Sequence, residues 1–287
     1  MALVIKTFFH QDSFTYSYVV ADTASTCAVV IDPVLDFDPA AGRTDTKSVD
    51  TILAFIKQEG FKVDWVSETH AHADHLSAAP YLKEHLSAKI GIGEGIRFVQ
   101  QTFAEVFNLG ANFPVDGRQF DRLFKDGDRI SLGECALSVM HTPGHTNDSV
   151  TYLVEDAAFV GDTLFMPDSG TARCDFPGGD AGLLYDSIQK ILALPDKTRL
   201  FMCHDYGANG NRDCRNETTV AEQKDHNIHV GDGKTRDEFI SLRTARDANL
   251  EVPKLLLPAV QVNIRAGNLP EPEENGSAYL KIPLNKF

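Results

Sequence analysis

Six consecutive residues contain three histidines and an aspartate, in the order His70-x-His72-x-Asp74-His75. They come directly after residues 63–67, whose apolar character is typical of a short buried strand. Imidazole and carboxylate groups are costly to bury unless they are paired or bound to a metal. Four such groups at the end of a buried strand therefore predict a metal site.

Three later segments each add one potential ligand. His145 lies in a Pro-Gly-His-Thr turn, Asp162 follows an apolar strand in a Gly-Asp-Thr sequence, and His204 ends another apolar strand. Each segment alone would suit a turn or a capping role. Taken together, they repeat one pattern, in which a histidine or an aspartate lies in the loop that follows the end of a strand. We expect these side chains to join the first cluster.

The elements that position these ligands change in type along the chain. We expect strands over 3–8, 14–21, 26–32, 63–67, 89–92, 129–140, 149–160 and 199–203. We expect helices over 47–59, 76–86, 95–107, 181–193, 219–227 and 235–247, and a loop or hairpin over 109–128. This order suggests mixed sheets covered by helices, in four layers if two sheets pack face to face. We expect one domain over 1–287, with 207–287 as a C-terminal helical and loop-rich extension.

Composition limits the possible partners. The formal net charge of −14 over 287 residues disfavours binding to nucleic acid or to anionic membranes. No apolar run approaches the roughly 18 residues of a membrane helix, and the N-terminal segment lacks the features of a signal peptide. The five cysteines include no CxxC pair, which favours free thiols in a reducing compartment. These features predict a cytoplasmic protein.

The ordered ligand series resembles that of the metallo-β-lactamase superfamily. It comprises His70, His72, Asp74, His75, His145, Asp162 and His204. The resemblance covers roughly residues 1–206. It implies an α/β (α+β) fold, the four-layer αββα sandwich, with the metal at one edge of the two sheets.

Within that superfamily, three segments resemble the persulfide dioxygenases, the group of the ethylmalonic-encephalopathy protein. Residues 170–176, Gly-Thr-Ala-Arg-Cys-Asp-Phe, are similar to the family's Gly-x-Gly-Arg-x-Asp-Phe, with Ala172 where a glycine is common. Residues 204–206 read His-Asp-Tyr, as in that family, where glyoxalase II usually has His-Glu-Tyr. Residues 258–267 loosely resemble the family's C-terminal segment. The segments 109–128 and 207–235 are longer than in the mitochondrial members, which suggests a bacterial branch.

The resemblance implies one Fe(II) per chain in a two-histidine, one-carboxylate site. The implied metal ligands and catalytic residues are His70, His145 and Asp162. The residues implied to orient them through hydrogen bonds are His72, Asp74, His75 and His204. The implied partners are glutathione persulfide and O2, which would yield glutathione and sulfite in sulfide oxidation.

The same resemblance implies how the substrate is bound. Arg173 matches the family's substrate-binding arginine, and Tyr206 matches the tyrosine of the His-Asp-Tyr segment. Arg265 is a further candidate, because an arginine can bind a carboxylate through two parallel hydrogen bonds. Arg212 and Arg215 read more simply as solvated loop charges. We interpret Cys174 as a small buried filler and not as a reactive thiol.

Other functions stay open to different degrees. A dinuclear hydroxyacylglutathione hydrolase of the glyoxalase II type is the main alternative, because all seven ligand positions for two metals are present. That enzyme would need Asp74 and His204 as direct ligands. The intact ligand set disfavours a catalytically inactive binding module, and the acidic composition disfavours a nuclease. Because relatives are often dimers, we expect a homodimer or a higher homo-oligomer.

Overall fold

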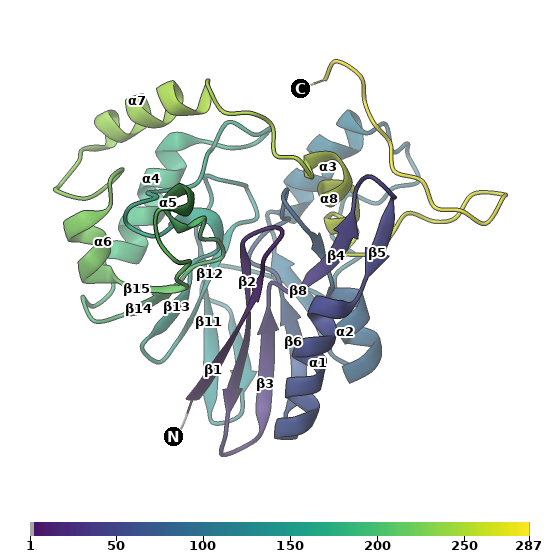
Figure 1. The fold of residues 1–287 in the computed structure, drawn as a ribbon, viewed down its shortest axis with the longest axis horizontal. Helices are drawn as coiled ribbons and strands as arrows, with labels where there is room; N and C mark the ends of the chain where they lie inside the picture. Colours follow the sequence, from purple (N-terminus) through teal and green to yellow (C-terminus); the bar gives the residue numbers. More distant parts are fainter. Residues whose placement is uncertain (1–2, 287) are drawn as a thin grey trace.

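Two six-stranded sheets form the centre of the structure, a computed structural model that describes residues 3–286 (Figure 1). The strand order of the first sheet is β1 (Leu3–His10), β2 (Thr15–Asp22), β3 (Cys27–Ile31), β6 (Lys62–Ser67), β8 (Lys89–Gly93), β9 (Arg122–Phe124). The order of the second sheet is β10 (Arg129–Leu132), β11 (Cys135–His141), β12 (Val150–Val154), β13 (Ala157–Phe159), β14 (Arg199–Phe201), β15 (Glu217–Thr219). A small third sheet contains β5 (Arg43–Asp45), β4 (Val34–Asp38), β7 (Leu76–Ser77).

Strand β2 shows why the two large sheets stack. All eight of its residues are buried, and successive side chains point to opposite faces. Val19 belongs to the apolar cluster that faces the helices of the first sheet, whereas Tyr18 and Val20 belong to the cluster between the sheets. The hydroxyl of Tyr18 donates to the carbonyl of Met202, just after β14, at 2.5 Å. The inner cluster therefore contains side chains from both sheets.

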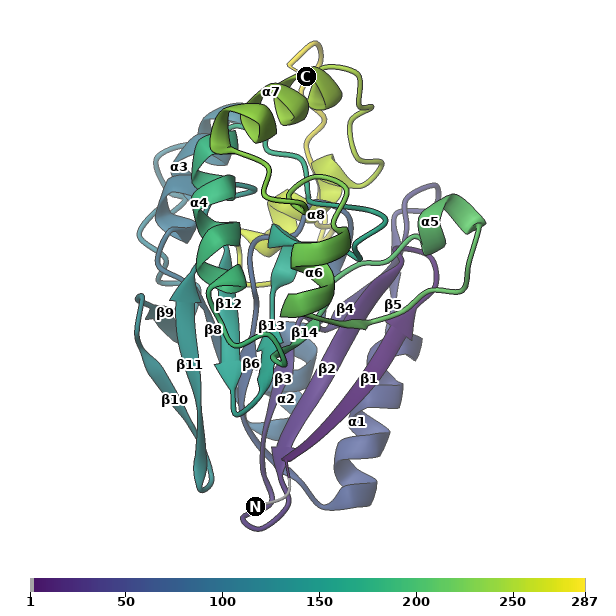
Figure 2. The same ribbon diagram turned by 90° about the vertical axis from the view of Figure 1, so that its left-hand side faces the viewer.

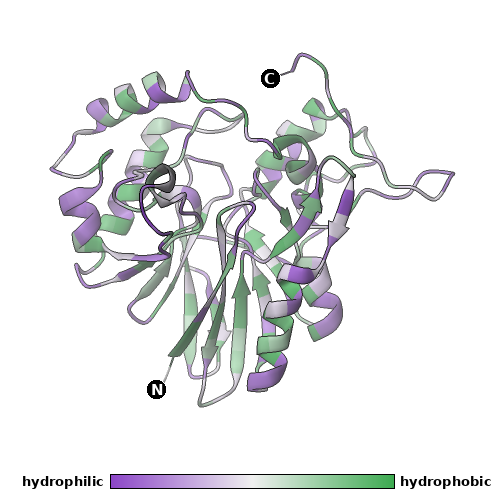
Figure 3. Ribbon diagram, viewed as in Figure 1, coloured by the Kyte–Doolittle hydropathy of each residue, from purple (hydrophilic) through white to green (hydrophobic). Residues whose placement is uncertain are grey.

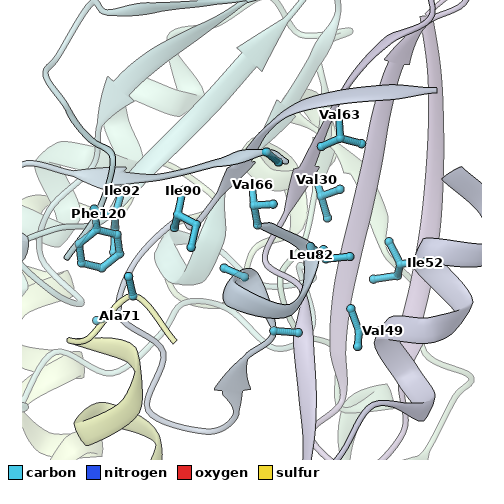
Figure 4. Close-up of a cluster of buried hydrophobic side chains, with 14 of the residues drawn as sticks. Val30, Val49, Ile52, Val63, Val66, Ala71, Leu82, Ile90, Ile92 and Phe120 are labelled. Atoms are coloured by element: carbon cyan, nitrogen blue, oxygen red, sulfur yellow. The ribbon is translucent and has the colours of Figure 1, made fainter. Parts of the chain in front are cut away.

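Three helices cover the outer face of the first sheet: α1 (Lys47–Glu59), α2 (Ala79–Leu86) and α3 (Ile96–Val106). The predicted helix 47–59 is confirmed, and it ends at Gly60 in the left-handed conformation. Figure 4 shows Ile52 of α1 and Leu82 of α2 directed toward Val30 and Val66 of the sheet. The helical spacing of the apolar residues thus produces one buried face.

Helices α4 (Ala181–Leu192), α6 (Val220–His226) and α7 (Arg236–Asp247) cover the second sheet (Figure 2). Ile188, Val220 and Phe239, one from each helix, share an apolar cluster with Leu200 of β14. The predicted four-layer αββα sandwich is confirmed. In Figure 3 the central strands are mostly hydrophobic and the covering helices carry hydrophilic residues, as burial between the layers requires.

Some elements differ from the expected ones for identifiable reasons. Segment 129–140 is a hairpin of β10 and β11, because Gly133 turns the chain with a φ of 62°. Residues 76–77 pair with β4, so α2 begins only at Ala79. Residues 256–263 form α8 (Leu256–Asn263), which is not among the helices expected from the sequence. Pro258 fits in the first turn of α8, where an N–H has no partner within the helix.

The predicted extension 207–287 packs on both halves of the sandwich. It begins with the short helix α5 (Gly207–Gly210). Phe239 of α7 joins the outer cluster of the second sheet, and Val260 of α8 joins that of the first sheet. The organisation of 1–287 as one domain stays a prediction. Among residues 3–286, no helix combines the length and the apolar character needed to cross a membrane.

Candidate metal centre

The predicted ligands lie at one edge of the sandwich, where strands of both sheets end. Segment 70–75 follows β6, and His145 lies between β11 and β12. Asp162 lies in a short 3-10 helix, η1 (Gly161–Thr163), after β13, and His204 follows β14. A β-bridge between Thr15 and His204 joins the two sheets at this edge. The two sheets therefore bring ligands from four loops into one site.

His70, His145 and Asp162 form one group of possible ligands. One atom from each lies within 4.8 Å of the others. Asp162 Oδ2 is 3.9 Å from His70 Nε2 and 3.7 Å from His145 Nε2. Within residues 3–286, His70 Nε2 is buried without a hydrogen-bond partner, as is Asp162 Oδ1. Buried polar atoms are rarely left unpaired. These two nitrogens and one carboxylate therefore fit a metal ion.

A second group adjoins the first and contains His72, Asp74, His75 and His204. His204 Nε2 is 3.2 Å from Asp74 Oδ2 and 3.4 Å from Asp162 Oδ1. Each residue of this group also presents a buried atom without a hydrogen-bond partner, including His72 Nδ1 and His75 Nε2. The carboxylate of Asp162 thus lies between the two groups, and the geometry offers ligands for a second ion as well.

Asp32 fixes the orientation of His70, and sequence reasoning missed this role. The carboxylate of Asp32 accepts hydrogen bonds from the backbone N–H of Thr69 at 2.7 Å and from its hydroxyl at 2.8 Å. Because that hydroxyl donates to Asp32, it accepts from His70 Nδ1 at 3.0 Å. His70 Nε2 is then left as the lone-pair nitrogen, which a metal ligand needs. The available signal was an aspartate at the end of a buried strand, the same signal that identified Asp162.

Three other histidines are held in a similar way, whereas His72 directs Nε2 to Asp32 at 3.1 Å. Nδ1 of His145 donates to the carbonyl of Arg173 at 2.6 Å, and Nδ1 of His75 lies 3.2 Å from the carbonyl of Leu76. Nδ1 of His204 lies 3.2 Å from the hydroxyl of Thr15. Each partner occupies Nδ1 and leaves Nε2 directed to the ligand groups. Such contacts fix both ring orientation and tautomer.

Asn263 of α8 holds the loop of residues 70–75 in place through hydrogen bonds. Its side-chain amide donates to the carbonyls of His72 and His75, both at 2.8 Å. Its Oδ1 accepts from the backbone N–H of Ser77 at 2.9 Å. The amide therefore ties together the loop that carries four of the seven ligands. Since α8 was not expected from the sequence, this contact was not predicted.

Burial sets the charge state of the site. Desolvation, with the neighbouring His72, lowers the pKa of His70 well below its usual value. Burial also lowers the pKa of His75 to about 3. Burial opposes a charge on His204 as well, yet the adjacent Asp74 raises the pKa of that imidazole well above its usual value. His70 and His75 are therefore neutral near pH 7, as metal binding requires.

A cavity of about 570 Å³ opens onto the ligands. Both Arg173 and Tyr206, which the sequence assigned to substrate binding, line it together with His145 and Asp162. Arg265 does not line this cavity. Its guanidinium lies over the ring of Phe113 at 4.8 Å.

Two further residues have structural partners. Arg212, read from the sequence as a solvated loop charge, instead pairs with Asp168 at 2.6 Å and with the buried Asp205 at 2.5 Å. Cys174 is buried, in agreement with its interpretation as a filler. Its sulfur lies 3.5 Å from Asp247, and burial raises the pKa of the thiol to about 12.

We expect Asp32→Ala to weaken metal binding roughly 10- to 100-fold, the usual cost of losing a residue that orients a ligand. The reason is that Thr69 loses its acceptor and no longer fixes the ring of His70. A competition titration with a chelator measures this affinity. Asp22→Ala is the matched control, because Asp22 is also a buried aspartate at the end of a strand. It ends β2, whereas the ligand edge is at the start of that strand, where Thr15 contacts His204. Equal metal affinity in the two variants would exclude the role of Asp32.

Comparison with known proteins places this site in a family. The model of the metallo-beta-lactamase superfamily matches residues 10–204. The chain is 53% identical over 293 residues to a probable metallo-hydrolase of Burkholderia pseudomallei, and the match covers 99% of each. It is 49% identical over 283 residues to glyoxylase B2 of Dictyostelium discoideum, covering 98% of this chain and 97% of the relative.

More distant relatives include the persulfide dioxygenases. The chain is 31% identical over 268 residues to the mitochondrial persulfide dioxygenase ETHE1 of Mus musculus, covering 92% of this chain and 89% of the relative. The crystal structure of ETHE1 from Myxococcus xanthus superposes with a TM-score of 0.74 at 33% identity, covering 92% of this chain and all of that one. The chain therefore belongs to the metallo-β-lactamase superfamily and, within it, to the ETHE1-like family.

Proposed function

We propose that this protein is a persulfide dioxygenase that oxidises glutathione persulfide with O2 and water to glutathione and sulfite. The observation that carries the proposal is the group of His70, His145 and Asp162, of which His145 and Asp162 line the cavity. Two histidines and one carboxylate are the ligands of non-haem iron oxygenases and leave coordination positions open. The similarity to ETHE1 proteins supports the same reaction.

One Fe(II), held by His70, His145 and Asp162, would supply the redox chemistry with O2 that zinc lacks. The protein's own residues shape the space around it. The ring of Phe176 lies 5.8 Å from that of His145, and the ring of Phe165 lies 6.4 Å from that of His204. Both line the cavity and limit the access of water to the ligands. His204 Nε2 lies 3.2 Å from Asp74 Oδ2, and Asp74 lines the cavity.

Arg173 links the substrate cavity to the metal ligands. Its side chain makes two hydrogen bonds to Asp175, at 2.6 and 2.7 Å, and lies over Phe176 at 4.7 Å. Its carbonyl accepts the hydrogen bond from His145. Arg173 therefore positions a ligand as well as lining the cavity. The cytoplasmic location and the homodimer or higher homo-oligomer stay predictions.

The proposal is tested by metal analysis and oxygen uptake. Protein purified without added metal should contain about one iron per chain, as a single site of this kind holds. With glutathione persulfide it should consume O2 and form sulfite. Two zinc ions per chain and no O2 uptake would contradict the proposal.

A dinuclear hydrolase of hydroxyacylglutathione is the second candidate. The observation that favours it is the second ligand group, with its unpaired nitrogens on His75 and His204. The names of the Burkholderia and Dictyostelium relatives point the same way. Hydrolysis of a hydroxyacylglutathione by the protein, lost in His75→Ala together with one of two metal ions, would support this function.

A further inference from the structure

The charged side chains that line the cavity are mostly neutralised by partners. Arg173 pairs with Asp175 at 2.6 Å, and Asp168 pairs with Arg212 at the same distance. These pairs leave little charge for a ligand. The remaining aspartates of the wall, at 74 and 162, belong to the metal groups.

Helix α7 contributes two arginines to the cavity wall, and they differ in their partners. Arg243 is buried and forms an ion pair with Asp247. Among residues 3–286, the guanidinium of Arg246 has neither a hydrogen bond nor an ion pair. Arg246 is therefore the cationic group of the wall that is available to a ligand.

The contacts of α7 hold Arg246 at the cavity. Residues 243, 246 and 247 are three and four positions apart, so they share one face of the helix. Arg243 donates to the carbonyl of Thr171 at 3.0 Å, and Asp247 accepts from the N–H of Cys174 at 3.0 Å. The carbonyl of Thr171 and the N–H of Cys174 both belong to the segment that carries Arg173. The helix is thus fixed to the cavity wall on either side of Arg246 in the sequence.

We propose that Arg246 binds a carboxylate of the substrate and thereby determines specificity for an anionic persulfide such as that of glutathione; this rests on the proposed function. The net charge of −14 repels anions at long range, so a local cation is needed at the cavity. A guanidinium matches a carboxylate with two parallel hydrogen bonds. Leu250 and Pro253, in the segment that follows α7, line the same cavity.

Titration calorimetry with glutathione, and with glutathione esterified at both carboxylates, tests the proposal on the intact protein. In Arg246→Ala the Kd for glutathione should rise about 10- to 100-fold, as expected for loss of a charge-assisted contact. The diester should bind the wild type and the variant equally, because esterification of the carboxylates and removal of the guanidinium each eliminate the same interaction. Arg129→Ala is the control, since Arg129 is an exposed arginine on β10.

Oxygen-uptake kinetics give a second readout. For glutathione persulfide, Arg246→Ala should raise KM by the same factor and leave kcat within about twofold, because the contact is equal in ground and transition states. An unchanged Kd and KM in a folded Arg246→Ala protein would overturn the assignment. If the wild type binds glutathione but consumes no O2, the proposed function fails. A weaker Kd in Arg246→Ala would still support Arg246 as the carboxylate-binding residue.

Discussion

Replacing Asp162 with alanine should remove the bound metal and abolish turnover. The carboxylate places Oδ2 near His70 and His145 and Oδ1 at 3.4 Å from His204. It therefore contacts both ligand groups, as a member of the first and as a neighbour of His204 in the second. Because the loss of a partner that only orients a ligand weakens metal binding about 10- to 100-fold, the loss of Asp162, proposed above as a direct ligand, should cost more than about 100-fold.

Elemental analysis and O2 uptake by Asp162→Ala measure both effects. Asp168→Asn is the control, because Asp168 lines the same cavity but pairs with Arg212 and not with the ligands. We expect the control to keep its metal. An Asp162→Ala protein with a full complement of metal and normal turnover would refute the assignment of the site. A circular-dichroism spectrum like that of the wild type would confirm that the variant is folded.

The location of the site was predictable because ligand type and strand ends coincide in the sequence. The apolar strand before His70 and those before Asp162 and His204 all end at the same edge, as the sandwich requires. The apolar spacing of residues 47–59 likewise matches the buried face of α1. These signals are local, because the helical spacing of apolar residues and the end of an apolar strand can each be recognised within a short stretch of sequence.

The supporting contacts were not predictable because they join distant segments. Thr69 and Asp32 are 37 residues apart, and Asn263 reaches His72 across 191 residues. Nothing near these residues in the sequence indicates such a partner. The role of Arg265 in substrate binding stays a prediction, and its guanidinium packs on Phe113 away from the cavity. Arginine type alone does not show which surface a guanidinium packs on.

The buried pair of Arg243 and Asp247 leads to the second large expected effect. Asp247→Ala should lower the free energy of unfolding by about 3–5 kcal/mol, because it leaves a buried guanidinium without a counter-ion. Both residues are buried, at 1% and 4% exposure. An arginine does not lose its proton in a protein, so the charge persists in the variant. The same change removes the acceptor of the N–H of Cys174, the residue after Arg173.

Urea unfolding, followed by far-UV circular dichroism and by the fluorescence of the single tryptophan, Trp65, measures this loss. Asp237→Ala is the matched control on α7, where an exposed first-turn aspartate should contribute less than about 1 kcal/mol.

The double variant Arg243→Met/Asp247→Leu distinguishes the effect of the unpaired charge from the effect of the missing carboxylate, because it removes both ions together. It should be more stable than Asp247→Ala, since apolar replacement of a buried pair is often neutral. If the double variant were as unstable as Asp247→Ala, the unpaired guanidinium would not be the cause. The loss would then come from the missing acceptor for Cys174, because both variants lack that carboxylate.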